Sequence, residues 1–402
     1  MQKLNMEKID RYMERRKIDP AGLRWLDPRD GMFEVSGFYW FQAEKRYHRF
    51  PRKMSRIPIA SAVKELASCT AGGQLRFRSD SRRIVLSVKT IGNIPRATMA
   101  ETARSGFDLY VGKPGSEIFW DTAKPVPGKM QYVSEIFRTK TREMREFRIN
   151  FPLYNGVSKL SVAIEENAEL LPPSPLPVKK PIVIYGTSIT QGGCASRPGS
   201  AFTNRLSREL QAEFLNFGFS GHGQNDPEIA GLLAEIEDPA MYILDSEANS
   251  ISAEKVRERV PRFLEILRRD HPETPIVIVT KVPYGPRYSQ EIPVLKEEFR
   301  KIYRAPEKGG RQKSVFRRRH EFLGAGRLFG KHGRRSPSHR SGICPDGGKA
   351  QAGPAETAEK IRSYSKTEIR FLPECRLMIV AVRQRQVRPE GDFGQCKAEN
   401  EK

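Results

Sequence analysis

The chain has 402 residues, of which 38% are hydrophobic, and a formal net charge of +22. This length suffices for two domains with sizeable cores, and no run of about 18 apolar residues occurs, so no membrane span is expected. Half of the net charge, +11, lies from residue 305 onward, where 22 Lys and Arg stand against 11 Asp and Glu. A polyanion partner is indicated only if such charge gathers on one face.

The N-terminal segment, MQKLNMEKIDRYMERRKID, is charged throughout and lacks the apolar centre of a secretory signal, so we expect cytoplasmic residence. Residues 1–24 are predicted to form a short amphipathic helix and a connection. The five cysteines contain no CxxC pair and no metal-ligand spacing, which predicts reduced, unpaired thiols and no metal site.

Short alternating runs separated by Gly and Pro predict a β-sandwich over residues 25–168. The expected half-buried strands are 75–78, 84–88, 107–111, 147–151 and 160–164. An aromatic cluster at residues 38–41, Phe-Tyr-Trp-Phe, has two interpretations. It is either a platform for a sugar or part of a core or inter-domain contact, and we favour packing because aromatic side chains bury well.

A Pro-rich linker over residues 169–181 is followed by regular alternation of strands and helices over residues 182–304. This pattern predicts a three-layer αβα domain of flavodoxin type. Pro261 lies inside the third helical pattern, so we expect a kink or a restart there. The predicted strands are 182–185, 214–218, 241–245 and 275–281, and the predicted helices are 200–213, 226–237, 254–270 and 290–304.

Ser188 is the candidate nucleophile. It follows the buried strand 182–185 in a small polar turn that leads into a helix, which places it at the carboxyl edge of a parallel sheet. Backbone N–H groups at a helix start can stabilise negative charge there. The alternative interpretation is an ordinary strand-to-helix turn capped by Ser or Thr.

Two later loops favour the catalytic interpretation of Ser188. A Gly-rich loop containing Gly221 follows the second strand, and a loop carrying Asn249 follows the third. If all three strands belong to one parallel sheet, the loops meet at the same edge. The N–H groups of Gly221 and Ser188 and the amide of Asn249 could then form an oxyanion hole.

At these positions the chain resembles the SGNH/GDSL hydrolase family. Gly186 to Ser188 is similar to its first block, with Thr187 where many members carry Asp. Ser220 and Gly221 are similar to the second block, and residues 244–249 to the third. In addition, residues 106–110, GFDLY, resemble the GxDLY signature of a β-domain that precedes certain SGNH hydrolases. The resemblance spans about residues 25–304 and implies an ester hydrolase without a metal or organic cofactor.

The family's last block, Asp-x-x-His, supplies the aspartate and the general base, and it is absent after Asn249. His222, in the oxyanion loop, is a weak candidate for the base. A solvated or binding role is more usual for a loop histidine. His271, at a helix end, is better suited to stabilising a helix dipole.

Residues 305–402 lose the alternating pattern and become rich in Arg, Gly and Ser, which predicts an irregular basic tail. The genetic code offers an explanation. Under permitted codons, residues 331–349 read one nucleotide later spell NTVDGVHPTDLGYARMAEK, which contains Asp-x-x-His and an amphipathic helix. The same shift turns residues 311–320 into a strand-like GRNLFFVEG. We therefore interpret the tail as a frame-shifted segment.

The favoured function is hydrolysis of small acyl esters, with O-acetyl groups on carbohydrates as the substrate that the resemblance suggests. Activity of this chain should be impaired by loss of the Asp/His block. The partner is then a small ester, not nucleic acid or a membrane. The alternative is a non-catalytic protein whose β-domain binds glycan and whose basic tail binds a polyanion.

Overall fold

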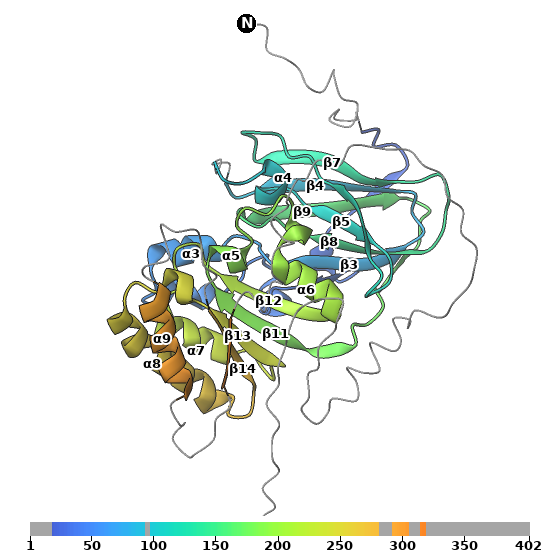
Figure 1. Ribbon diagram of the computed structural model, residues 1–402. Helices are drawn as coiled ribbons and strands as arrows, with labels where there is room; N and C mark the ends of the chain where they lie inside the picture. Colours follow the sequence, from blue (N-terminus) through green and yellow to red (C-terminus); the bar gives the residue numbers. More distant parts are fainter. Residues whose placement is uncertain (1–17, 93–96, 281–291, 305–313, 319–402) are drawn as a thin grey trace, which may run out of the picture.

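Residues 18–92, 97–280, 292–304 and 314–318 are described by the computed structural model. They form a strand-rich N-terminal domain followed by an α/β domain with a parallel sheet (Figure 1), which confirms the predicted fold class. The expected N-terminal helix lies mostly outside the described residues. Its last two residues, 23 and 24, belong instead to strand β1.

The N-terminal domain consists of two antiparallel sheets with an apolar layer between them. One sheet has the order β1-β9-β4-β7, and the other has the order β10-β3-β8-β5-β6, with β2 paired to β3. All five predicted strands are present, as β3, β4, β5, β8 and β9. The strands are β1 (Leu23–Leu26), β2 (Glu34–Ser36), β3 (Gln74–Ser79), β4 (Arg83–Thr90), β5 (Asp108–Val111), β6 (Ile118–Thr122), β7 (Gln131–Arg138), β8 (Arg145–Asn150), β9 (Val157–Glu165) and β10 (Leu170–Leu171).

The link between the domains is shorter than predicted. Strand β10 pairs with β3, and strand β11 of the second domain already begins at Val178. The expected linker over 169–181 is thus reduced to residues 172–177. Leu170 and Leu171 extend the sandwich because they continue an antiparallel ladder along the free edge of β3.

The second domain is a five-stranded parallel sheet with the order β12-β11-β13-β14-β15 and helices on both faces. Side chains alternate between the faces of β11: Val183 and Tyr185 face a cluster with α7, α8 and α9, while Ile182 and Ile184 face α6. The strands are β11 (Val178–Gly186), β12 (Ala212–Gly218), β13 (Met241–Asp245), β14 (Ile276–Thr280) and β15 (Ser314–Arg318). The helices are α5 (Ser188–Gln191), α6 (Phe202–Leu210), α7 (Pro227–Ala234), α8 (Ala253–Asp270) and α9 (Ile292–Arg304).

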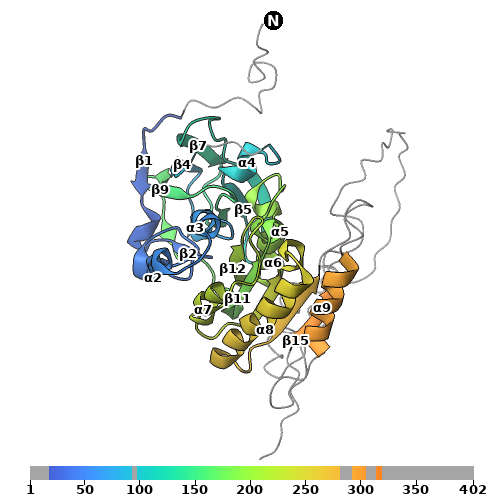
Figure 2. The same ribbon diagram turned by 90° about the vertical axis from the view of Figure 1, so that its left-hand side faces the viewer.

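Two expectations about this domain need correction. The tail was predicted to be irregular from residue 305, but residues 314–318 form β15, parallel to β14 and beside α9 (Figure 2). The edge of β14 offers unpaired backbone groups that an extended segment can pair with. The rest of the predicted tail lies outside the described residues. Of the kink or restart expected at Pro261, the restart does not occur, since α8 continues through this residue.

Among the described helices, none combines the length and the hydropathy that a membrane crossing requires. The short helices of the N-terminal domain, α2 (Phe41–Glu44), α3 (Ser61–Ala67) and α4 (Glu101–Arg104), were not predicted. Helix α3 packs against the parallel sheet of the second domain through Val63 and Leu66. Helix α3 precedes the second domain in the chain, yet it supplies part of that domain's core.

The aromatic cluster at residues 38–41 connects the two domains. Phe38 and Phe41 are each 3% exposed and lie in the sandwich core. Tyr39 and Trp40 pack against the core of the α/β domain, where Trp40 contacts Phe217 at a ring-centroid distance of 6.3 Å. The members of the cluster are thus packed into the two cores, in agreement with the favoured interpretation.

Arg49 is a second connection between the domains. Its side chain is 1% exposed and donates hydrogen bonds to the backbone carbonyls of Asn216 and Gly218 in β12 and of Leu66 in α3. The guanidinium also lies 4.6 Å from the ring centre of Phe219. Burial lowers the pKa of Arg49 to about 10. Arg49, which precedes the second domain in the chain, therefore fixes the position of the carboxyl end of β12.

Asp108, within the GFDLY stretch, is fully buried and joins the sandwich to the α/β domain. It accepts hydrogen bonds from Gly199 N–H at 2.7 Å and from the Asn150 amide at 2.8 Å. Burial raises the pKa of its carboxyl to about 6, against the opposing effect of these two hydrogen bonds. The folded protein therefore holds the proton of Asp108 more tightly than the unfolded chain does.

We expect Asp108 to make stability fall as pH rises. Because its pKa is about 6 when folded and about 3.9 when unfolded, its contribution is complete below about pH 4 and is lost as pH rises through 6. The loss amounts to about 3 kcal/mol at most. Urea unfolding at pH 4.5 and 7.5 should show this slope in the parent and not in Asp108→Asn. If the free energy of unfolding changed equally with pH in both proteins, the pH dependence could not be assigned to Asp108.

Candidate active site

The carboxyl ends of three neighbouring strands lie in register. Gly186, at the end of β11, is paired with Gly218 of β12 on one side and with Asp245 of β13 on the other. Ser188 follows its strand end by two residues, Gly221 by three and Asn249 by four. The three predicted site residues therefore leave the sheet at one edge.

Ser188 is the first residue of α5 and is partly exposed. The preceding residue, Thr187, is extended and caps the helix, since its hydroxyl accepts from Ile189 N–H at 3.4 Å. Thr187, and not Ser188, is therefore the residue that caps this strand-to-helix turn. The hydroxyl of Ser188 has no capping role. The helix ends after one turn at Gly192, whose φ of 103° is in the left-handed region.

The backbone carbonyl of Ser188 accepts three hydrogen bonds. Two come from Gly192 N–H at 3.1 Å and Gly193 N–H at 2.7 Å. The third comes from the phenol of Tyr154 at 3.2 Å, a buried residue of the N-terminal domain. The sandwich therefore contributes directly to the position of Ser188. Tyr154 was not predicted, because only the docking of the domains reveals its partner.

Asn249 reaches the Gly-rich loop through its side chain. It ends the short 3₁₀ turn η4 (Glu247–Asn249), and its Oδ1 accepts from Gly223 N–H at 3.2 Å. This bond fixes which end of the amide is the acceptor, so the Nδ2 hydrogens are left as donors. Within the described residues they have no acceptor. The amide hydrogens are therefore available for a further hydrogen bond.

The Gly-rich loop packs directly on the turn that carries Ser188. A Cβ atom at Gly223 would lie 2.5 Å from the carbonyl oxygen of Gly186, so no larger residue fits there. Gly221 has a φ of 73°, which favours glycine, and is exposed. The structure thus brings the loops of Ser188, Gly221 and Asn249 together.

Buried polar contacts tie α5 to its surroundings. The hydroxyl of Thr190 donates to Asp245 at 2.8 Å beneath the site. The side chain of Gln191 accepts from Ser220 N–H at 3.0 Å and donates to the carbonyl of Leu153 in the sandwich at 3.2 Å. These bonds connect α5 to β13, to the Gly-rich loop and to the N-terminal domain.

The histidines of the described part of the chain make no hydrogen bond to Ser188. His222 lies in the predicted loop, with its ring Nδ1 3.0 Å from the carbonyl of Ser220. His271 terminates α8, and its Nε2 lies 2.8 Å from the carbonyl of Ala234, the last residue of α7. Its position at helix ends agrees with the expected dipole-stabilising role. The histidines of the predicted tail, residues 305–402, lie outside the described residues.

A parallel sheet with a serine at the first strand-to-helix turn and two further loops at the same edge is the arrangement that the resemblance to SGNH hydrolases implies. Comparison with known proteins identifies similar families. Residues 179–304 match the model of the GDSL-like Lipase/Acylhydrolase family, and residues 23–170 match the model of the GxDLY N-terminus of SGNH-hydrolase-type esterases. The α/β domain is therefore similar to the GDSL-like lipase/acylhydrolase family, and the sandwich before it is similar to the GxDLY domain, as predicted.

Solved structures resemble the chain over most of its length. A structure described as a GDSL-like lipase from Bacteroides ovatus has a TM-score of 0.69 and 27% identity, covering 77% of this chain and 92% of its own. A salicylyl-acyltransferase from a tetracycline biosynthetic pathway has a TM-score of 0.62 and 18% identity, covering 75% and 86%. The latter likeness shows the fold alone. None of the curated proteins compared with the chain matches its sequence.

Proposed function

We propose that the α/β domain is a serine ester hydrolase acting on small acyl esters. The observation that carries this proposal is the hydrogen bond from Gly223 N–H to Asn249 Oδ1 at 3.2 Å. It joins two of the three loops, and the contact of Gly223 with Gly186 joins the third. On this proposal the hydroxyl of Ser188 and the donors of Gly221 and Asn249 act on one ester group at the sheet edge.

The chemistry follows from this arrangement. The Ser188 oxygen attacks the ester carbonyl and gives its proton to a base, while the N–H groups of Ser188 and Gly221 and the amide of Asn249 hold the oxyanion. The alkoxy leaving group departs with the proton that the base returns. Water then attacks the acyl-serine, again with help from the base, and releases the acid.

The base is the missing component of this chain as written. We propose that the Asp-x-x-His block has been lost through a one-nucleotide frame shift near residues 303–312, so that activity is impaired. The shift thus falls near the point where the family match ends, at residue 304.

The substrate we propose is an O-acetyl group on a carbohydrate, in line with the esterase-type N-terminal domain. A chain whose tail is rewritten in the shifted frame should release acetate from acetylated xylo-oligosaccharides, measured by an enzyme-coupled acetate assay. Ser188→Ala in the same chain should release none above background. Hydrolysis of p-nitrophenyl acetate with no release from the oligosaccharide would reject the carbohydrate substrate and keep the esterase.

A further inference from the structure

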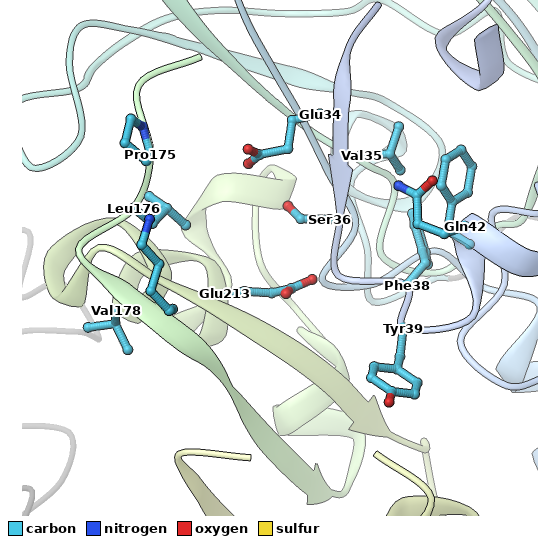
Figure 3. Close-up of a pocket in the computed structure, with 12 residues that line it drawn as sticks. Glu34, Val35, Ser36, Phe38, Tyr39, Gln42, Pro175, Leu176, Val178 and Glu213 are labelled. Atoms are coloured by element: carbon cyan, nitrogen blue, oxygen red, sulfur yellow. The ribbon is translucent and has the colours of Figure 1, made fainter. Parts of the chain in front are cut away.

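A cavity of about 350 Å³ lies between the sandwich and the start of the parallel sheet (Figure 3). Its walls come from β2, from residues 38–42, from the link between the domains and from the first residues of β11 and β12. Glu213 precedes Gly218 by five residues of β12, which is roughly 16 Å of strand. The cavity is thus separate from the edge that carries Ser188.

Glu213 is a carboxylate without a cation. Its Oε1 accepts from Gly37 N–H at 2.7 Å, and it forms no ion pair with any residue in the described ranges. Burial raises the pKa of Glu213, and the nearby charge of Glu34 raises it further. The site therefore holds negative charge at a cost that a bound cation would reduce.

Glu34 adds charge of the same sign on the opposite wall of the cavity, as Figure 3 shows. Its partner is Arg76, at 2.9 Å, but this buried guanidinium also pairs with Glu146 at 3.1 Å. One positive charge is thus shared by two carboxylates. Lys179 also lines the cavity, yet within the described residues it forms no ion pair.

The remaining walls are apolar or neutral. Phe38, Leu176 and Val178 provide carbon surface, and the hydroxyl of Ser36 points into the space (Figure 3). Two carboxylates are fewer oxygen ligands than a Ca²⁺ or Mg²⁺ site requires. The negative walls disfavour an anion, and a neutral ligand would leave Glu213 uncompensated. The volume is at the lower end of the range for small-molecule sites.

We propose that this cavity binds a small aliphatic ammonium ion. The ammonium group lies between Glu213 and Glu34, where it donates charge-assisted hydrogen bonds. The alkyl part packs on Phe38, Leu176 and Val178. This inference does not depend on the esterase proposal, because it uses neither Ser188 nor the sheet edge around it.

The test is titration calorimetry of the full chain with n-butylammonium chloride at pH 8 and low salt. Glu213→Gln should weaken binding at least tenfold, while its Oε1 still accepts from Gly37 N–H. The matched control is Glu258→Gln, which changes an exposed carboxylate of α8. This variant should bind the amine like the parent. The neutral isostere n-butanol should bind at least tenfold more weakly than the amine. Equal binding of butanol, or an unchanged Glu213→Gln, would overturn the proposal.

Two further variants separate the ligand site from a purely structural role. Ser36→Leu fills the cavity with the carboxylates intact and should abolish binding. Lys179→Met removes a competing cation and should leave binding equal or tighter, so a loss of binding there would count against the assignment. Binding should also weaken as pH falls through the raised pKa of Glu213, because protonation removes the charge that attracts the amine.

Discussion

A chain whose tail is rewritten in the shifted frame should hydrolyse p-nitrophenyl acetate roughly 10³-fold faster, or more, than the chain as written. The described residues bring the loops of Ser188, Gly221 and Asn249 to one edge, but within them no histidine is hydrogen-bonded to Ser188. The shifted frame supplies the missing Asp-x-x-His. Without a base, the serine hydroxyl stays protonated near neutral pH, and only the oxyanion donors and binding accelerate the reaction. The measurement is kcat/KM at pH 8.

Two controls belong with this experiment. Ser188→Ala in the rewritten chain should return the rate to that of the parent, and a chain ending at residue 304 should be no faster than the parent. A parent chain that is already a fast esterase would refute the frame-shift account of lost activity. His222, in the Gly-rich loop, would then be the first residue to replace.

The second large effect concerns Asn249. In the rewritten chain, Asn249→Asp should lower kcat by about 10²–10³, the usual cost of one oxyanion-hole donor. Aspartate is nearly isosteric and keeps the oxygen that accepts from Gly223 N–H, but it replaces the free amide hydrogens with an acceptor. The loop contact thus survives while the donor is lost. Steady-state kinetics should show the effect in kcat more than in KM.

Ser250→Ala is the matched control for Asn249→Asp, because Ser250 is the next residue and, among the residues that the structure describes, its hydroxyl donates only to the carbonyl of Ser246, at 3.4 Å. It should retain parental kcat. If Asn249→Asp were fully active, Asn249 would merely brace the Gly-rich loop. The oxyanion hole would then consist of backbone N–H groups alone.

The site edge was predictable because it depends on local patterns. Apolar runs end at Gly186, Gly218 and Asp245, and parallel pairing brings such ends into register without knowledge of any side-chain contact. The predicted strands of the sandwich were found for the same reason, since alternation is visible within five residues. Assignment of Ser188, Gly221 and Asn249 to one edge needed nothing further.

The missed elements lack such local patterns. In β7 the polar Ser134 is 6% exposed and its hydroxyl accepts from Lys124 N–H, while Val133 on the outer face is 50% exposed. At these two positions the polar side chain is buried and the apolar one is exposed, which is the reverse of the usual alternation in a strand. Strand β6 lies at an edge with Ile118 and Trp120 exposed, so its composition suggests burial that does not occur.

The contacts between the domains were invisible for a different reason. Asp108 and Gly199 are 91 residues apart, and Tyr154 and Ser188 are 34 apart. No periodicity relates such pairs, because their meeting depends on how the sandwich docks on the sheet. The residue types alone could not indicate that Gly199, of all the glycines, donates to the buried carboxylate of Asp108.

The buried guanidinium of Arg49 also constrains the order in which the chain can assemble. Its carbonyl acceptors at Asn216 and Gly218 lie 167 and 169 residues later, which corresponds to roughly 10–30 s of synthesis. Until β12 exists, this cation must remain hydrated, and α3 has no sheet to pack on. The N-terminal half therefore leaves the ribosome with a surface that only β12 and its sheet can cover, and the contacts between the two domains form late in synthesis.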